Sequence, residues 1–200
     1  MGHALLAVAP ILTGTALLLV GNGVFSTFLA LRMSMEGFAT GSIGMVVASY
    51  SIGFLAGCRF SPPLIRRVGH IRAFAALAGI TCAITLLYPF VVSTLPWVAL
   101  RAFNGAAAAG MFMITESWLN HRTRSDERGR VLAVYTIANK LAFGGGQFLL
   151  GLADPAGHLL FMIPAIAYAL SLLPVALTAE TAPPIQDARR MPLADLYRAS

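Results

Sequence analysis

The stretch ESWLNHRTRSDERGR, residues 116–130, is the most charged part of a very apolar chain. A nearly charge-free run precedes it, and a run that contains a single lysine follows it. A charged segment between two long apolar runs is typical of a cytoplasmic loop between two membrane helices. If residues 116–130 form such a loop, they fix the direction in which every other helix crosses the membrane.

The composition of the whole chain supports a membrane protein. Of its 200 residues, 58% are hydrophobic and only 11% are charged, and the mean hydropathy is +0.76. A soluble domain of this size needs more polar surface, and one bilayer crossing takes about 20 apolar residues. We therefore predict an all-α integral membrane bundle over residues 1–179, followed by a cytoplasmic tail or linker over 180–200. The predicted spans are residues 5–31, 41–60, 71–92, 97–119, 131–152 and 159–177.

The basic residues predict the orientation of these spans. Three segments rich in arginine, 61–72, 116–130 and 180–200, all fall on one side of the predicted bundle, and the other side has Arg32 with Glu36 and Asp154. Because positive charge collects in cytoplasmic loops, both termini are expected in the cytoplasm. Nucleic acid is not an expected partner, since these arginines lie in short loops and form no face of their own.

Other classes of protein find no support in the sequence. No pair of histidines has metal-ligand spacing, so no metal is expected, and no phosphate-binding motif points to nucleotide hydrolysis or to another cofactor. We see no catalytic arrangement and predict no enzyme. Cys58 and Cys82 are interpreted as packing residues.

Small, aromatic and proline residues lead to further expectations. Gly21 and Gly23 flank Asn22, which indicates either a close helix contact or a polar group that faces a cavity. The pair Gly53 and Gly57 is typical of helix packing. The remaining expectations place Pro62 and Pro63 at a helix end, residues 61–72 in a basic connection, and Trp97 and Trp118 in an interfacial aromatic belt.

Lys140 is the strongest candidate for a functional residue. It lies ten positions into the fifth span, about 15 Å deep, where a charge is costly unless it meets water or a partner. Gln147 shares its helical face, and Tyr135 and Asn139 form an adjoining polar strip. One interpretation is a cavity wall that presents a cation to a substrate. The other is a lysine that reaches the interface or pairs with an acid outside this chain.

Arg101 and Asn104 share one face of the fourth span, and two interpretations also hold there. Either they contact substrate, or Arg101 is bonded to helix backbone near the outer interface. Glu116 is fifteen residues further along, about 22 Å away, so it cannot pair with Arg101 within that helix. We expect it to meet Arg67, or Arg128 and Arg130, as a cytoplasmic gate, with a proton-coupling carboxylate as the alternative.

Several motifs resemble those of a known family. The major facilitator superfamily usually carries Gly-x-x-x-Asp-Arg-x-Gly-x-Arg/Lys in its second loop, which Arg67, Gly69 and Arg72 approach, with Arg66 in place of the aspartate. Arg101 and Gly105 match its Arg-x-x-x-Gly in the fourth span. Within the superfamily the chain resembles bacterial permeases of the YcaD type, at residues 67–74, 116–120, 128–135 and 146–150.

This resemblance implies a function and an architecture. The chain would be the N-terminal half of a secondary active transporter, with two inverted three-helix repeats in the bacterial inner membrane. It would move a small solute by alternating access, coupled to an ion or proton, together with a second six-helix half or a second copy. A non-transporting membrane scaffold is the alternative. The implied latch to the other half lacks its acid, because Arg66 occupies that position.

Overall fold

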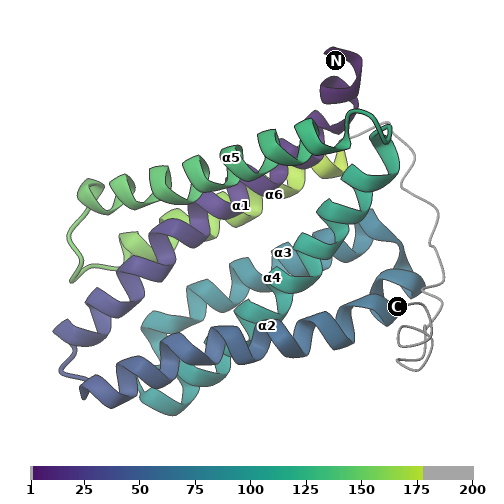
Figure 1. Cartoon of the computed structure of the whole chain (residues 1–200). Coiled ribbons are helices and arrows are strands. Elements are labelled where there is room, and N and C mark those ends of the chain that lie inside the picture. Colours follow the sequence, from purple (N-terminus) through teal and green to yellow (C-terminus); the bar gives the residue numbers. More distant parts are fainter. Residues whose placement is uncertain (1, 178–200) are drawn as a thin grey trace, which may run out of the picture.

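The computed structural model describes residues 2–177, which form a bundle of six α-helices and no strand (Figure 1). The all-α prediction is therefore confirmed for the described residues. The predicted tail at 180–200 lies outside them. The helices are α1 (Gly2–Met35), α2 (Thr40–Val68), α3 (His70–Leu87), α4 (Thr94–Arg122), α5 (Arg128–Gln147) and α6 (Leu159–Ala176), with short 3-10 turns at Tyr88–Phe90 and Phe148–Leu152.

Five of the described helices are long and apolar enough to cross a membrane, with segments Val8–Met35, Thr40–Val68, His70–Phe90, Thr94–Arg122 and Leu159–Ala176. The sixth helix, α5, falls short of that apolarity. It is also shorter than predicted, because its last predicted residues form the 3-10 turn Phe148–Leu152. The polar side chains of Asn139, Lys140 and Gln147 make α5 the least apolar helix of the bundle.

Helices α1 and α4 occupy the middle of the bundle. Helix α1 packs against α5 and α6, helix α4 packs against α2 and α3, and α1 and α4 also touch each other. In Figure 1, α1, α5 and α6 form the upper group and α2, α3 and α4 the lower one. Helix α2 has the smallest buried share of the five apolar spans, so α2 and the exposed face of α5 form the open flanks of the bundle.

Glycines allow the helix backbones to approach closely at two contacts, between α2 and α4 and between α1 and α5. A Cβ at Gly53 of α2 would overlap the carbonyl of Ala102 on α4, and one at Gly105 would overlap the carbonyl of Tyr50. On α1, a Cβ at Gly23 would overlap the carbonyl of Phe143 on α5. The expected helix packing at Gly53 is confirmed, and the Gly-Asn-Gly stretch stays helical while Gly23 forms a close contact.

The predicted end of the second span is wrong. Helix α2 continues through Pro62 and Pro63 to Val68, and only Gly69 separates it from α3. The two prolines leave the carbonyls of Cys58 and Arg59 without their helical donors, but the rest of this 29-residue helix keeps its backbone bonds and stays continuous. Gly69 has a φ of 85°, a conformation that favours glycine, and this single residue makes the turn that the sequence predicts across residues 61–72.

The interfacial belt is also a wrong prediction. Trp97 is 0% exposed and Trp118 is 2% exposed, so both rings point into the bundle. The indole Nε1 of Trp97 donates a hydrogen bond to the carbonyl of Tyr88 at 3.2 Å, and its ring stacks on Phe38 at 5.3 Å. The position of each tryptophan near a helix end predicted contact with the membrane interface. Burial, however, depends on which face of the helix carries the side chain, and both rings lie on inner faces.

Candidate functional site

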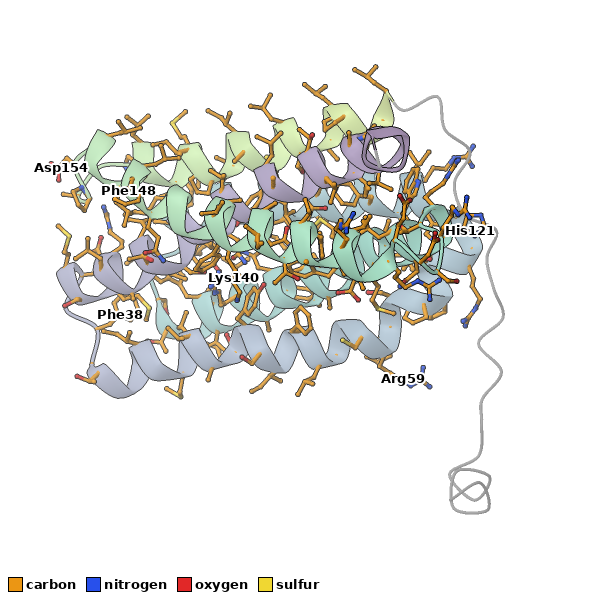
Figure 2. All side chains as sticks on the ribbon, turned by 45° about the horizontal axis from the view of Figure 1, so that its top comes forward. Phe38, Arg59, His121, Lys140, Phe148 and Asp154 are labelled. Carbon is orange, nitrogen blue, oxygen red and sulfur yellow. The ribbon has the colours of Figure 1, made fainter. Side chains whose placement is uncertain are left out.

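Lys140 lies on the open side of α5 and is exposed. Figure 2 shows it part-way along the bundle, between the end marked by Phe38 and Asp154 and the end marked by Arg59 and His121. It is twelve residues from the start of α5, about 18 Å along the axis. Its ammonium makes no hydrogen bond or ion pair with any residue between 2 and 177. The ammonium group of Lys140 therefore faces the surroundings of this bundle near the middle of its length.

The exposed surface of α5 has a polar side and an apolar side. At about 100° per residue, Thr136, Lys140 and Gln147 fall within an arc of about 40°, and all three are exposed. We call these three residues the α5 polar stripe. The neighbouring side carries the exposed apolar residues Val134, Ile137 and Leu141, followed by the exposed Phe148 at the start of the 3-10 turn. Only the apolar side is suited to contact with lipid tails.

Asn139 lies at the edge of the polar stripe and is only partly buried. Tyr135, one turn earlier on α5, packs in the core near Val131. Both residues therefore lie on the side of α5 that turns from the exposed stripe toward the core, and a polar strip formed by their side chains stays a prediction.

A second polar site is centred on Arg101 of α4. Its Nη2 donates a hydrogen bond to the Ser26 hydroxyl on α1 at 2.8 Å. Its Cζ lies 4.6 Å from the ring centroid of Tyr50 on α2 and 5.3 Å from that of Phe25 on α1. Two aromatic faces thus flank the guanidinium, which is a stabilising cation–π arrangement. The guanidinium bonds no helix backbone, so the interpretation of Arg101 as an interfacial, backbone-bonded residue does not fit the structure.

Asn22 completes this cluster. Its Nδ2 donates to the Tyr50 hydroxyl at 3.3 Å, and its Oδ1 accepts a hydrogen bond from Ser26 at 3.4 Å. Both distances are long for their type, so these bonds are weak. We call Asn22, Phe25, Ser26, Tyr50 and Arg101 the Arg101 cluster.

The sequence indicated Asn22 and Arg101 but missed their partners. Ser26 follows Asn22 by four residues and therefore shares its face, which is a signal that the sequence does contain. The contribution of Tyr50 depends on how α2 rotates against α1 and α4, and no pattern within α2 shows that rotation.

Several buried polar atoms in this region lack partners. Nε and Nη1 of Arg101 and both amide atoms of Asn104 make no hydrogen bond within the described chain. Arg101 is 5% exposed and Asn104 is 3% exposed. Arg101 also forms no ion pair there, because the carboxylates of residues 2–177 lie toward the ends of the helices or in the connections: Glu36, Glu116, Asp126, Glu127 and Asp154.

At the end of the bundle near His121, the predicted gate residues are close to the surface. Glu116 is exposed, and among the described residues it makes no ion pair with Arg67 or Arg128. Arg128 instead donates from Nη2 to the carbonyl of Asn120 at 3.5 Å, across the loop. Arg66, Arg67 and Arg72 are exposed around the turn at Gly69. The sequence missed one link here, between His70 Nε2 on α3 and the Ser117 hydroxyl on α4, at 3.2 Å.

At the opposite end of the bundle, Arg32 links the end of α1 to the turn before α6. Its Nη2 pairs with Glu36 at 2.6 Å, and its Nη1 donates to the carbonyls of Pro155 at 2.9 Å and Ala156. These bonds fix the turn before α6 to the end of α1. No group of three or more His, Cys, Asp or Glu side chains in residues 2–177 is placed to hold a metal ion.

Long apolar helices, a mid-depth lysine and a buried arginine cluster define the class of a polytopic membrane protein with intramembrane polar sites. The chain belongs to the Major Facilitator Superfamily, whose family model matches residues 11–196. Among curated proteins it is similar to the "Uncharacterized MFS-type transporter YcaD" of Salmonella enteritidis PT4 and of Salmonella dublin. In both cases 30% of 154 aligned residues are identical, covering 77% of this chain and 40% of the relative. The chain thus spans less than half the length of these relatives. The resemblance to this superfamily and to its YcaD-type members is confirmed.

Proposed function

We propose that this chain is the N-terminal six-helix half of a secondary active transporter, which moves a small solute across the bacterial inner membrane by alternating access. Lys140 is the observation that carries this proposal. An ionisable group at mid-depth is costly in a membrane protein and is a functional residue by default. On α5 it is exposed and has no partner within the described chain. The energy source would be a proton or ion gradient, and we propose no enzymatic activity.

The packing pattern supports two inverted three-helix repeats. In such an arrangement α1, α2 and α3 correspond to α4, α5 and α6. Helix α2 packs on α4 through Gly53 and Gly105, and helix α5 packs on α1 through Gly146 and Gly23, which is the matching contact. Likewise α3 packs on α4 while α6 packs on α1. The substrate would then bind near the midplane, between the two repeats and a second unit.

The distribution of charge supports cytoplasmic termini. Arg59 and His121 mark one end of the bundle and Asp154 the other (Figure 2). The arginines of the α2–α3 turn and of the α4–α5 loop all belong to the first end, while Arg32 at the second is paired with Glu36. The positive-inside rule places the first end in the cytoplasm.

The α5 polar stripe supports a second six-helix unit. Lipid cannot satisfy the side chains of Lys140 and Gln147, whereas the exposed apolar side chains of α2, such as Ile52 and Leu55, fit either lipid or protein. A second unit opposite α2 and α5 would enclose the polar stripe and the Arg101 cluster in a common space. That unit is either a C-terminal half or a second copy of this chain.

Transport can be tested in membrane vesicles from cells that express the whole protein. We expect at least one solute to accumulate when a proton or ion gradient is imposed and to be lost when an ionophore collapses that gradient. Untargeted mass spectrometry of the vesicle contents detects any solute that accumulates, so the substrate does not have to be chosen in advance. Identical contents in energised, collapsed and protein-free vesicles would favour a membrane scaffold instead.

A cytoplasmic gate is part of the proposal, and Glu116→Gln tests it. We propose that Glu116 pairs with Arg67 or Arg128 when the cytoplasmic side closes, with Arg66, Gly69 and Arg72 forming the adjacent turn. A partly hydrated ion pair is worth up to about 1 kcal/mol, so its loss should shift the population toward the inward-open state by up to about fivefold.

The measurement is the rate at which a membrane-impermeant maleimide applied from the cytoplasm labels Thr136→Cys, in a background without Cys58 and Cys82. Asp126→Asn is the control, because Asp126 is an exposed loop acid paired with Arg124 at 3.4 Å. Equal labelling rates in Glu116→Gln and the parent protein would remove Glu116 from the gate.

A further inference from the structure

The charge of Arg101 is buried and is not neutralised by any described residue. Cation–π contact with Phe25 and Tyr50 offsets only part of the free-energy cost of burying this charge. The hydrogen bond to Ser26 occupies one N–H of Nη2. Nε and Nη1, which together carry three N–H groups, have no acceptor. An anionic acceptor from outside the described chain would balance both the charge and these donors.

Asn104 limits what that acceptor can be. It lies three residues after Arg101 on α4, so the two side chains share one face of the helix. Its amide group has a donor nitrogen with two N–H groups and an acceptor oxygen, and both atoms are buried without a partner. A simple anion satisfies the donor alone. A ligand that satisfies the whole amide carries a hydrogen-bond donor next to its anionic group.

Three of the four side chains around Arg101 are only partly buried, and the fourth, Phe25, is fully buried. Ser26 and Tyr50 contact the guanidinium directly, and Asn22 joins them through hydrogen bonds of 3.4 Å and 3.3 Å. All three keep some exposed surface, whereas Arg101 is almost fully enclosed. A polar ligand can replace these two weak bonds at little cost and so reach the guanidinium.

From these observations we infer that Arg101 and Asn104 form a subsite for a small carboxylate with an adjacent hydroxyl or amino group. The carboxylate accepts from Nε and Nη1 of Arg101, and the neighbouring donor and acceptor meet the amide of Asn104. This inference rests on the proposed function and adds the chemical class of the substrate. Lys140, on a different helix and outside this cluster, is not needed for it.

Three small probes of almost the same size test the subsite. Lactate has both the carboxylate and the hydroxyl, propionate has the carboxylate alone, and lactamide has the hydroxyl without the charge. The whole protein in lipid nanodiscs is titrated with each probe at constant ionic strength, and dissociation constants are taken from the rise in melting temperature. We expect lactate to bind most tightly, propionate about fivefold more weakly, and lactamide about 30-fold more weakly or worse.

Variants assign the effect to the two residues. Arg101→Gln should weaken lactate by about 30-fold or more and erase its advantage over lactamide. Asn104→Ala should weaken lactate about fivefold and leave propionate unchanged. Arg59→Gln, which removes an exposed arginine from the end of the bundle, is the matched control and should bind as the parent does. Without ligand, Arg101→Gln should melt no lower than the parent, because it removes an uncompensated buried charge.

The comparison of lactate with lactamide in the unaltered protein needs no variant, so the inference can fail even if a variant does not fold. Equal stabilisation by the two probes overturns it. No response to any carboxylate, combined with a lower melting temperature for Arg101→Gln, also overturns it and points to a protein carboxylate from a second unit. Gradient-driven transport of only neutral or cationic solutes overturns the subsite but leaves the proposed function standing. Selective lactate binding in a protein that transports no solute would support the subsite but overturn the proposed transport function.

Discussion

Lys140→Ala is expected to abolish gradient-driven solute accumulation while the protein still inserts into the membrane. The side chain is exposed and bonded to no described residue, so its removal takes no packing or hydrogen bond from the bundle. Any loss must therefore come from what the ammonium meets outside the bundle. Removing one partner from a desolvated charge interaction costs about 2–5 kcal/mol, which lowers the rate by about 30-fold or more.

The vesicle assay measures this loss, and two variants of the same helix serve as controls. Lys140→Arg keeps a cation at that depth and should retain part of the activity. Thr136→Ala removes a neighbouring hydroxyl that donates to the carbonyl of Leu132 within the same helix at 2.9 Å, so it should transport nearly as the parent does.

Lys140→Ala also separates the two interpretations of this lysine. If Lys140 pairs with an acid of a second unit, the variant should weaken the contact between the two units and lower the melting temperature of the whole protein in lipid nanodiscs. If it faces substrate, the melting temperature should stay unchanged while accumulation is lost. Accumulation at the level of the parent protein would exclude both roles and leave a lysine that reaches the interface.

The apolar runs predicted the helices well because a membrane span must be long and continuously apolar. The same reasoning placed the ends of helices less well. Pro62 and Pro63 indicate a stop in the sequence, yet α2 continues to Val68. Each proline removes one backbone donor, and the loss of two bonds does not end a helix of 29 residues.

The candidate site could be predicted only within single helices. Counting along the fifth span gave the depth of Lys140, and the spacing of three residues put Arg101 and Asn104 on one face. The contact of Arg101 with Ser26 and Tyr50 depends on the rotation and tilt of three helices, which the pattern of one helix does not determine. Trp97 shows the same limit, since its position near a helix end said nothing about the inner face on which it lies.

Gly53→Ala is expected to destabilise the protein even though alanine is the better helix former. On an open helix surface, glycine to alanine stabilises by up to about 1 kcal/mol. At Gly53, however, the added Cβ overlaps the carbonyl oxygen, the carbonyl carbon and the Cα of Ala102 on α4. These are backbone atoms, which cannot turn aside as a flexible side chain could, so α2 must move away from α4.

The separation of α2 from α4 would reach the Arg101 cluster, because Tyr50 of α2 lies one turn from Gly53 and its ring covers the guanidinium. Overpacking of this kind costs about 1–3 kcal/mol. We therefore expect a lower melting temperature for Gly53→Ala in lipid nanodiscs, together with weaker carboxylate binding at Arg101.

Gly44→Ala is the matched control for this change. Gly44 lies on the same helix, nine residues earlier and therefore on its opposite face, and a Cβ there meets nothing within 4 Å. The same substitution should leave the melting temperature unchanged or raise it. Because helix propensity acts equally at both positions, a difference in sign isolates the α2–α4 contact. If both variants melt at or above the parent temperature, the close approach of these two helices does not stabilise the bundle.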